Sequence, residues 1–259
     1  SSEKILPKSK EVALRLILIY ITLTIFCAIF YKIFGMNFFD SITHSMTTIA
    51  TGGFSNYNES LGFFNSRFIE SSAIIFILLG SIPFISYIKF LNGDREIFFK
   101  DIQIKTFLKI VFFSIVILSI YLNFNGSIKF DFIAVLFNVI SILTGTGYVN
   151  AQFDSWGSFS LVLFLILMFI GGCAGSTTCG VKIFRIQILY SFVINNLKKI
   201  IYPKGVFILK YDQNPIDNKF ISSIISFIYL YLVIFFIITA LLSLSGLDFI
   251  TAISGAATS

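Results

Sequence analysis

The chain alternates long apolar runs with short segments rich in Gly, Thr, Ser and Asn. Runs long enough to cross roughly 30 Å of hydrocarbon extend from about residue 12 to 34, 68 to 91, 106 to 123, 158 to 173 and 221 to 244. A sixth run, residues 181 to 197, is weaker because it contains Lys182, Arg185 and Gln187. The pattern predicts an all-α polytopic membrane protein.

The segments on one side of these spans repeat. GMNFFDSITHSMTTIATGGFSN (residues 35–56) aligns with residues 129–150 after a shift of 94, so that Gly53 corresponds to Gly147. A shift of 211 aligns GMNFFDSITHSMTT with GLDFITAISGAATS (residues 246–259). Each copy predicts a span, a re-entrant helix of about a dozen residues that is too short to cross the bilayer, a Gly/Thr loop and a returning span. An Asn or Asp stands near the start of each short helix, where it would cap the first turn.

The Gly/Thr loops raise the question of what they do inside a membrane. Non-helical backbone at that depth is tolerated only where it is buried in protein or lines a water-filled path. Carbonyl oxygens along such a path can replace the hydration shell of a monovalent cation, and glycine supplies the positive φ angles that the strand needs. TGGFS (residues 51–55) and GTGYV (residues 145–149) both fit the filter signature Thr-Val-Gly-Tyr-Gly around its middle glycine. A plain turn between helices is the alternative for any one loop.

A second Gly-rich stretch, FIGGCAGSTTCGVKIFRIQIL (residues 169–189), differs in kind. Gly175 and Gly180 have the spacing of a phosphate-binding loop, but the required Lys and Ser/Thr do not follow, and no strand precedes them. The stretch interrupts a returning span on the cytoplasmic side of the loops, which favours a gate. The alternative is a kink relieved by packing of small residues. Lys182 and Arg185 either pair with carbonyls of the broken helix or extend to the inner headgroups.

Composition and charge fix the class and the orientation. With 56% hydrophobic and 12% charged residues and a mean hydropathy of +0.91, the chain is not an ordinary soluble domain. All but three of the 19 Lys and Arg lie at the N-terminus, in residues 89–109 or in residues 182–219, which predicts that these segments are cytoplasmic. The polar, basic start runs directly into the first span, so no cleavable signal peptide is visible.

The outer side holds Lys32, Arg67 and Lys129, and acidic residues outnumber them: Asp40, Glu59, Glu70, Asp131, Asp154 and Asp248. A negative outer surface would concentrate cations, although outer loops poor in Lys and Arg follow from topology alone. The net charge of +6 is therefore explained by the excess of Lys and Arg in the segments predicted to be cytoplasmic. No basic patch interleaved with aromatic residues indicates nucleic-acid binding.

The remaining reactive residues point to little chemistry. Cys27, Cys173 and Cys179 give no disulfide framework, and a metal at the last two is disfavoured because no His or acidic residue is nearby. For His44, in the middle of a short helix, a hydrogen-bonded structural role is favoured over proton coupling. No nucleophile–base pair, metal cluster or pair of acids indicates an enzyme.

HSMTTIATGGFSNYN, SILTGTGYVNAQFDSW and above all GGCAGSTTCGVKIFRI resemble the pore subunit of the Trk/Ktr family of bacterial potassium uptake systems, closest to its TrkH branch. The resemblance covers essentially the whole chain. It implies a pseudo-fourfold pore of four repeats, each with a span, a pore helix, a filter loop and a span. Residues 1–105 would be the second repeat, 106–218 the third, and 219–259 a truncated fourth. The first repeat, the fourth filter loop and the last span, with its arginine near the gate, are missing, so this chain alone is not expected to conduct.

The resemblance also implies the roles of individual residues. The selectivity filter would comprise Ala50, Thr51, Gly52, Gly53, Phe54, Thr144, Gly145, Thr146, Gly147 and Tyr148, with K⁺ as the bound ion. The gating loop would comprise Gly171, Gly172, Gly175, Ser176, Thr177, Thr178 and Gly180, with Lys182 and Arg185 as gate partners. No covalent cofactor is expected, and nucleotide would bind only to a regulatory partner.

The expected function is passive passage of potassium, and also sodium, through the filter of a pore subunit in the bacterial inner membrane. Expected partners are a second copy in a homodimer, a TrkA-like nucleotide-binding regulatory subunit on the cytoplasmic side and membrane lipids, without nucleic acid. One alternative is a secondary transporter, a K⁺/Na⁺ or K⁺/H⁺ symporter with broken helices. Inverted repeats would support it, whereas these copies share one orientation. The other alternative is a non-conducting assembly subunit.

Overall fold

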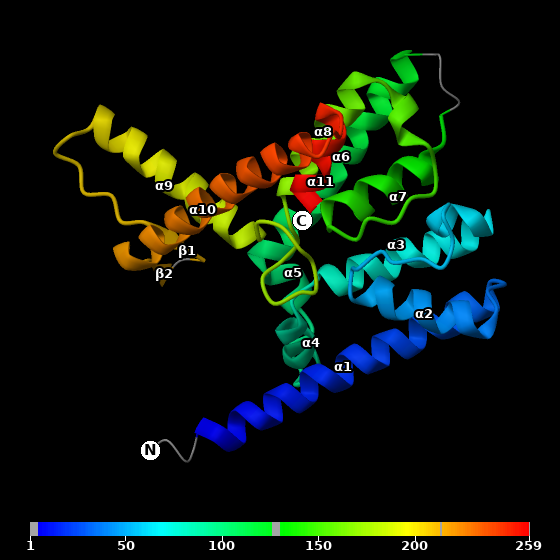
Figure 1. Cartoon of the computed structure of the whole chain (residues 1–259). Helices are drawn as coiled ribbons and strands as arrows, with labels where there is room; N and C mark the ends of the chain where they lie inside the picture. The colour runs from blue at the N-terminus through cyan, green and yellow to red at the C-terminus, as the bar shows by residue number, and fades with distance from the viewer. Residues whose placement is uncertain (1–4, 126–129, 213, 259) are drawn as a thin grey trace. The chain divides into compact units, whose positions relative to one another are not determined.

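The computed structural model describes residues 5–125, 130–212 and 214–258, so Lys129 and the ends of the chain lie outside the described residues. The fold is helical (Figure 1). Its α-helices are α1 (Ile5–Ile33), α2 (Phe38–Ile49), α3 (Arg67–Ser81), α4 (Phe84–Leu91), α5 (Ile97–Lys100), α6 (Ile102–Asn125), α7 (Phe132–Leu143), α8 (Ser158–Phe169), α9 (Ile183–Ile201), α10 (Asn218–Leu244) and α11 (Phe249–Thr258). Ser60–Phe64 and Phe153–Trp156 form 3₁₀ turns, and β1 (Lys210–Tyr211) pairs antiparallel with β2 (Asn214–Pro215).

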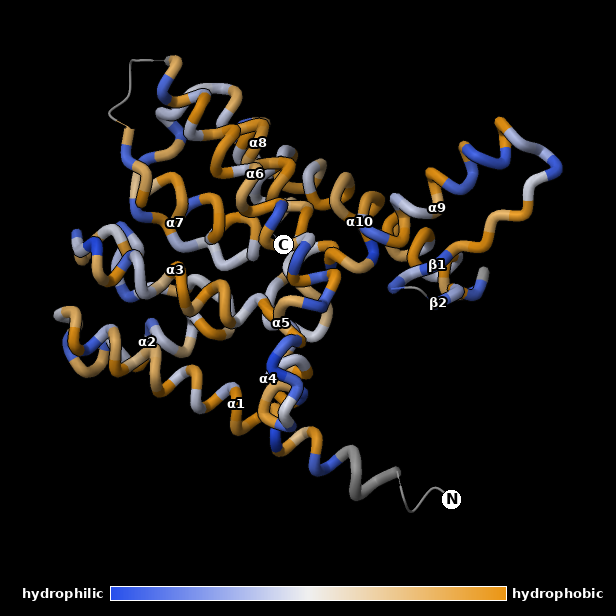
Figure 2. Tube along the Cα trace, turned by 180° about the vertical axis from the view of Figure 1, so that it is seen from behind, coloured by the Kyte–Doolittle hydropathy of each residue, from blue (hydrophilic) through white to orange (hydrophobic). Residues whose placement is uncertain are grey.

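Three of the described helices are long and apolar enough to cross a membrane, over Lys10–Ile33, Ile102–Phe124 and Lys219–Leu244. They are predominantly hydrophobic along their length (Figure 2). Many of their large apolar side chains face outward, as Leu18 of α1, 62% exposed, illustrates. Such exposure is costly in water and favourable against lipid tails.

The second predicted span, residues 68 to 91, is not one continuous helix. It consists of α3 and α4, which meet at an angle of 85°. The break falls at Ile82 and Pro83, since proline lacks an N–H and disfavours helical conformation in the residue before it. Ile82 is extended, with φ −82° and ψ 147°. The first N–H of α4, from Phe84, donates instead to the carbonyl of Gly175 at 2.9 Å.

The chain forms two compact units, Ser1–Gly180 and Val181–Ser259. In the first unit, α1 packs against α2, α3 and α4, while α7 packs against α3, α6 and α8. In the second unit, α10 packs against α9 and against α11. A small apolar core of Ile188, Leu209, Ile221 and Ile224 joins α9, α10 and the segment between them. The predicted repeat boundaries at residues 105 and 218 divide the chain differently and stay predictions.

The short helices begin in the same way. The side chain of Asn37 accepts a hydrogen bond from the Asp40 N–H at the start of α2, and Asp131 accepts from Ile133 and Ala134 at the start of α7. At α11, Asp248 accepts from the Thr251 N–H at 3.2 Å. These caps satisfy backbone donors that have no partner inside the helix, and they confirm the sequence assignment of capped short helices.

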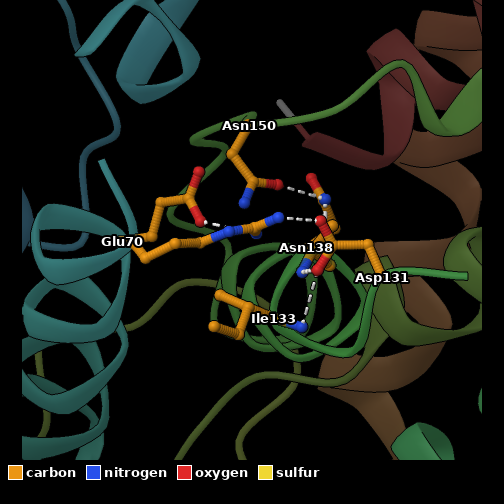
Figure 3. A network of polar contacts seen from close by, with 7 residues as sticks. Glu70, Asp131, Ile133, Asn138 and Asn150 are labelled. Atoms are coloured by element: carbon orange, nitrogen blue, oxygen red, sulfur yellow. Dashed lines mark hydrogen bonds and ion pairs between the residues drawn. The ribbon is translucent and has the colours of Figure 1, made fainter. Parts of the chain in front are cut away.

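Charged residues join the start of α3 to the start of α7 (Figure 3). Arg67, at the start of α3, pairs with Glu70 at 3.1 Å and also with Asp131. Burial is the strongest single effect on Asp131 and raises its pKa, but the hydrogen bond and charge of Arg67 and the two backbone N–H groups of the cap together outweigh it, so the pKa lies below its usual value. Because the folded-state pKa is lowered, the stabilisation is complete at neutral pH and is lost as the pH falls through that pKa.

Asp131 therefore has two separable contributions to stability. Asp131→Asn keeps the helix cap and loses the charge pair, which at this partly exposed site contributes about 0.5 kcal/mol. Asp131→Ala also loses the cap, which contributes about 1 kcal/mol more. Thermal unfolding in detergent should rank the wild type above Asp131→Asn and Asp131→Ala below both. Equal melting temperatures for all three proteins would contradict the assigned cap and ion pair.

Candidate ion pathway

The loops that follow α2 and α7, residues 50–54 (the first loop) and 144–148 (the second loop), share one backbone path. Each begins by closing the helix, through Ala50 N–H to Met46 O and Thr144 N–H to Ile140 O, both at 3.0 Å. Each loop then turns back toward its helix. The Gly52 N–H donates to the Thr47 carbonyl at 2.8 Å, and the equivalent Thr146 N–H donates to the Ser141 carbonyl at 2.9 Å. These equivalent bonds reproduce the repeat read from the sequence.

The dihedral angles repeat as well. Thr51 and Gly145, which correspond, have φ of 49° and 71°, and Gly53 and Gly147 have φ of 65° and 82°. Left-handed conformation is unusual for a threonine, and such strain concentrates at functional sites. The positive φ that the filter interpretation required of Gly53 and Gly147 is present at both positions.

A hydroxyl on each short helix holds the end of its loop. Thr47 Oγ1 donates to the carbonyl of Phe54 at 3.0 Å, and Ser141 Oγ donates to the carbonyl of Tyr148 at 2.7 Å. The sequence analysis did not identify these hydroxyls, although the shift of 94 residues already paired them. The carbonyls of the two aromatic residues are therefore tied to the helices.

The carbonyls between these fixed ends are different. Within the described residues, no hydrogen bond is donated to the carbonyl oxygens of three residues in each loop: Thr51, Gly52 and Gly53 in the first, and Gly145, Thr146 and Gly147 in the second. Thr51 and Thr146 are only 1% and 2% exposed. Gly52 and Gly53 are half-buried, and Gly145 and Gly147 are exposed. Buried carbonyls without a hydrogen-bond partner are uncommon, so the carbonyl oxygens of Thr51 and Thr146 in particular are free to coordinate a bound cation.

The two loops meet each other. A Cβ atom on Gly53 would lie 1.7 Å from the carbonyl oxygen of Thr146, whereas a Cβ on Gly147 would meet nothing within 4 Å. The side chain of Tyr148 is fully buried and extends from the second loop to α2, the helix before the first loop. There its hydroxyl contacts Thr47, Thr48 and the carbonyl of His44. The second loop is thereby fastened to the helix that precedes the first.

The Gly-rich segment (residues 171–180) contacts both loops at their deeper ends. Thr177 Oγ1 donates to the carbonyls of Ile49 at 2.8 Å and Gly80 at 3.0 Å, and Thr51 Oγ1 lies 3.4 Å from it. A Cβ on Gly145 would lie 3.1 Å from the Cβ of Cys179. These contacts fall where each loop leaves the C-terminal end of its short helix.

The segment is folded tightly on itself and against its neighbours. Gly172 N–H donates to Thr178 Oγ1 at 3.0 Å, and Ser176 Oγ lies 2.8 Å from the same hydroxyl. A Cβ on Gly171 would lie 2.0 Å from the carbonyl oxygen of Cys179, which only glycine permits. Gln103 of α6 accepts from the Ala174 N–H at 2.9 Å. Sequence reasoning missed Gln103, whose only signal was a polar amide near the start of an apolar helix.

The remaining candidates are placed as follows. Lys182 immediately precedes α9, and the Arg185 guanidinium lies over the ring of Phe227 in α10, 3.8 Å from its centroid. Cys27, Cys173 and Cys179 are free thiols. Within the described parts of the chain, no three His, Cys, Asp or Glu side chains form a group that could hold a metal ion.

Comparison with known proteins decides the family. The TrkH family, described as cation transport protein, matches residues 1–258. The chain belongs to the TrkH family. It is 35% identical to the Trk system potassium uptake protein TrkI of Halomonas elongata, over 99% of this chain and 53% of that protein. It is 31% identical to the Trk system potassium uptake protein TrkH of Escherichia coli K12, over 95% of this chain and 52% of that protein.

A solved structure gives the same result for the fold. The crystal structure of the potassium transporter TrkH from Vibrio parahaemolyticus matches with a TM-score of 0.91 and 32% identity, covering 97% of this chain and 55% of that chain. The predicted all-α polytopic fold and the TrkH resemblance are confirmed, as is the prediction, from family membership, that this membrane protein is not an enzyme. The chain spans about half the length of the curated relatives that it matches.

Proposed function

We propose that the chain forms part of the pore of a potassium uptake system, in which the ion passes a filter of backbone carbonyls. The observation that carries this proposal is the pair of equivalent loops whose central carbonyls, from residues 51–53 and 145–147, accept no hydrogen bond within the described residues. Neutral carbonyl oxygens suit a monovalent cation, because several of them can replace its hydration shell. Relatives that are named potassium uptake proteins support potassium as that ion.

The Gly-rich segment is the proposed gate. It touches the cytoplasmic end of both loops through Thr177 and Cys179, so an ion leaving the filter would have to pass it. Only a few hydrogen bonds hold this segment against the loops, and each has a net contribution of about 1 kcal/mol. A segment held this weakly can move aside as a gate must. Lys182 and Arg185 are proposed as residues that respond to this movement from the start of α9.

The proposed setting follows from the family. The protein acts in the inner membrane as a homodimer, with a TrkA-like regulatory subunit on the basic cytoplasmic segments, and nucleotide binds to that subunit. The filter needs no cofactor. Two loops supply only part of a ring, and other parts of the full-length protein supply the rest. Passive conduction is favoured over coupled symport because the three copies share one orientation.

Growth of a bacterium that lacks its own potassium uptake systems tests this function. The complete gene product should restore growth at micromolar potassium, and a variant with Gly53→Ser should fail to do so while reaching the membrane in equal amount. Restored growth by both proteins would remove the first loop from the pathway. Failure of the wild type to restore growth, with protein correctly inserted, would contradict potassium uptake and favour the assembly role.

A further inference from the structure

The short helices α2 and α7 each carry one buried polar side chain at the same position. His44 and Asn138 correspond under the shift of 94 residues, and both are fully buried, with no exposed surface. The ring of His44 packs against aromatic neighbours, including Phe64 at 5.5 Å between centroids. Burying a polar group in this way is costly unless its hydrogen bonds are satisfied.

The hydrogen bonds of His44 define its tautomer and its partner. Nδ1 lies 2.9 Å from the carbonyl of Asp40, which can only accept, so Nδ1 carries the hydrogen. Nε2 of the neutral ring then accepts from Ser55 Oγ, 3.0 Å away. Ser55 Oγ in turn accepts from the N–H of Tyr57 at 3.2 Å. The ring therefore connects its own helix to the segment that leaves the first loop.

Asn138 makes the same connection in the second copy. Its Nδ2 donates to the carbonyl of Ala134, four residues earlier, at 2.8 Å, and to Asn150 Oδ1 at 2.7 Å. Asn150 lies two residues beyond the end of the second loop, and Ser55 lies one residue beyond the end of the first. His44 and Asn138 thus make equivalent contacts from equivalent positions. Each bonds to the backbone carbonyl four residues earlier and to a side chain in the segment that follows its loop.

The position of these bonds relates them to the loops. The carbonyls of Phe54 and Tyr148 are already fixed by Thr47 and Ser141. The bonds to Ser55 and Asn150 add a second attachment, one residue beyond Phe54 and two residues beyond Tyr148. The segment that follows each loop is thereby held to its helix at two points. The carbonyls of residues 51–53 and 145–147, which accept no hydrogen bond within the described residues, lie between the end of the helix and these two attachments.

We propose that His44 and Asn138 are positioning residues that fix the outer end of each filter loop and thereby help set the spacing of the carbonyls that select the ion. This inference rests on the proposed function of the loops as a filter. A carbonyl ring discriminates between ions of different size through its geometry and its stiffness. Freedom at the outer end lets the ring contract around a smaller ion, so losing the attachment weakens discrimination before it abolishes transport.

The experiment compares five variants of the complete gene product in potassium-loaded liposomes: four single changes and the double variant of His44→Leu with Ser55→Ala. The readout is the ratio of the external potassium and sodium concentrations that halve rubidium uptake. His44→Leu removes both bonds of the ring, and Ser55→Ala removes its partner on the strand. His44→Gln places a side-chain oxygen where Nε2 lies and so keeps the bond to Ser55. Met46→Leu is the matched control, since Met46 lies on the same helix and is 55% exposed.

We expect His44→Leu and Ser55→Ala each to reduce the preference for potassium by about fivefold, as the loss of one buried hydrogen bond would. The double variant should lose no more than either single one, because both remove the same contact. His44→Gln and Met46→Leu should retain the wild-type ratio. A merely structural role would lower the amount of inserted protein and leave the ratio unchanged.

An unchanged ratio in His44→Leu and Ser55→Ala, with a selective wild type, would overturn the inference and leave the proposed function intact. If His44→Leu does not insert, Ser55→Ala decides alone, because that change lies outside the helix. A loss in His44→Gln equal to that in His44→Leu would also contradict the bond to Ser55. A wild type without preference for potassium would instead overturn the proposed function.

Discussion

Replacing Gly53 with alanine should abolish potassium uptake, whereas the same change at Gly147 should leave a measurable part of it. The two glycines correspond in the repeat, and both have positive φ. At Gly53, however, the new methyl would lie 1.7 Å from the carbonyl oxygen of Thr146, and at Gly147 it would meet nothing within 4 Å. Gly147→Ala therefore costs only backbone strain of about 1 to 2 kcal/mol, while Gly53→Ala must push the two loops apart.

The measurement is the initial rate of rubidium uptake per inserted protein. We expect the uptake rate of Gly53→Ala to fall below roughly a tenth of the wild-type rate, the factor that corresponds to 1.4 kcal/mol. The rate of Gly147→Ala should stay well above that level, with a reduced preference for potassium. Gly93→Ala is the matched control, because Gly93 has φ of +105° and no neighbour within 4 Å of an added Cβ, and it lies far along the chain from either loop. Equal rates for Gly53→Ala and the wild type would contradict the contact between the loops.

Deleting residues 175–180 should raise uptake when no regulatory subunit is present. The deletion removes the hydrogen bonds of Thr177 to Ile49 and Gly80 and the contact of Cys179 with Gly145, and so frees the cytoplasmic end of both loops. We expect an increase of about tenfold or more, since several bonds of about 1 kcal/mol each are lost together.

A finer pair of variants separates loss of the gate from general damage. Thr177→Val keeps the shape of the side chain and loses its hydroxyl, whereas Thr177→Ser keeps the hydroxyl. Thr177→Val should raise uptake by about fivefold, and Thr177→Ser should match the wild type. A deletion variant that inserts normally but transports no faster than the wild type would show that this segment does not close the pathway.

Much of the fold was predictable because repetition and periodicity are local properties of a sequence. The short helices with their caps at Asn37 and Asp131, and the loops around Gly53 and Gly147, follow from apolar run lengths, turn residues and a constant shift. Pro83 is the sequence signal for the bend between α3 and α4, whereas hydropathy alone shows an uninterrupted apolar run and predicts one straight span.

The contacts that assemble the pathway were not predictable in the same way. Thr177 and Ile49 are separated by 128 residues, and Tyr148 and Thr48 by 100. Which hydroxyl reaches which carbonyl depends on how the helices pack, and one sequence contains no record of it. The sequence did contain a partial signal for Thr47 and Ser141, because the shift of 94 residues pairs these two hydroxyl residues.

The measurement that tests the central claim most directly is radioactive rubidium uptake into potassium-loaded liposomes containing the complete gene product, with external potassium or sodium as the competitor. The account predicts uptake that potassium blocks at a far lower concentration than sodium does. It also predicts that Gly53→Ala removes this uptake. Uptake that both ions block equally, or that survives Gly53→Ala unchanged, would contradict a potassium filter formed by these carbonyls.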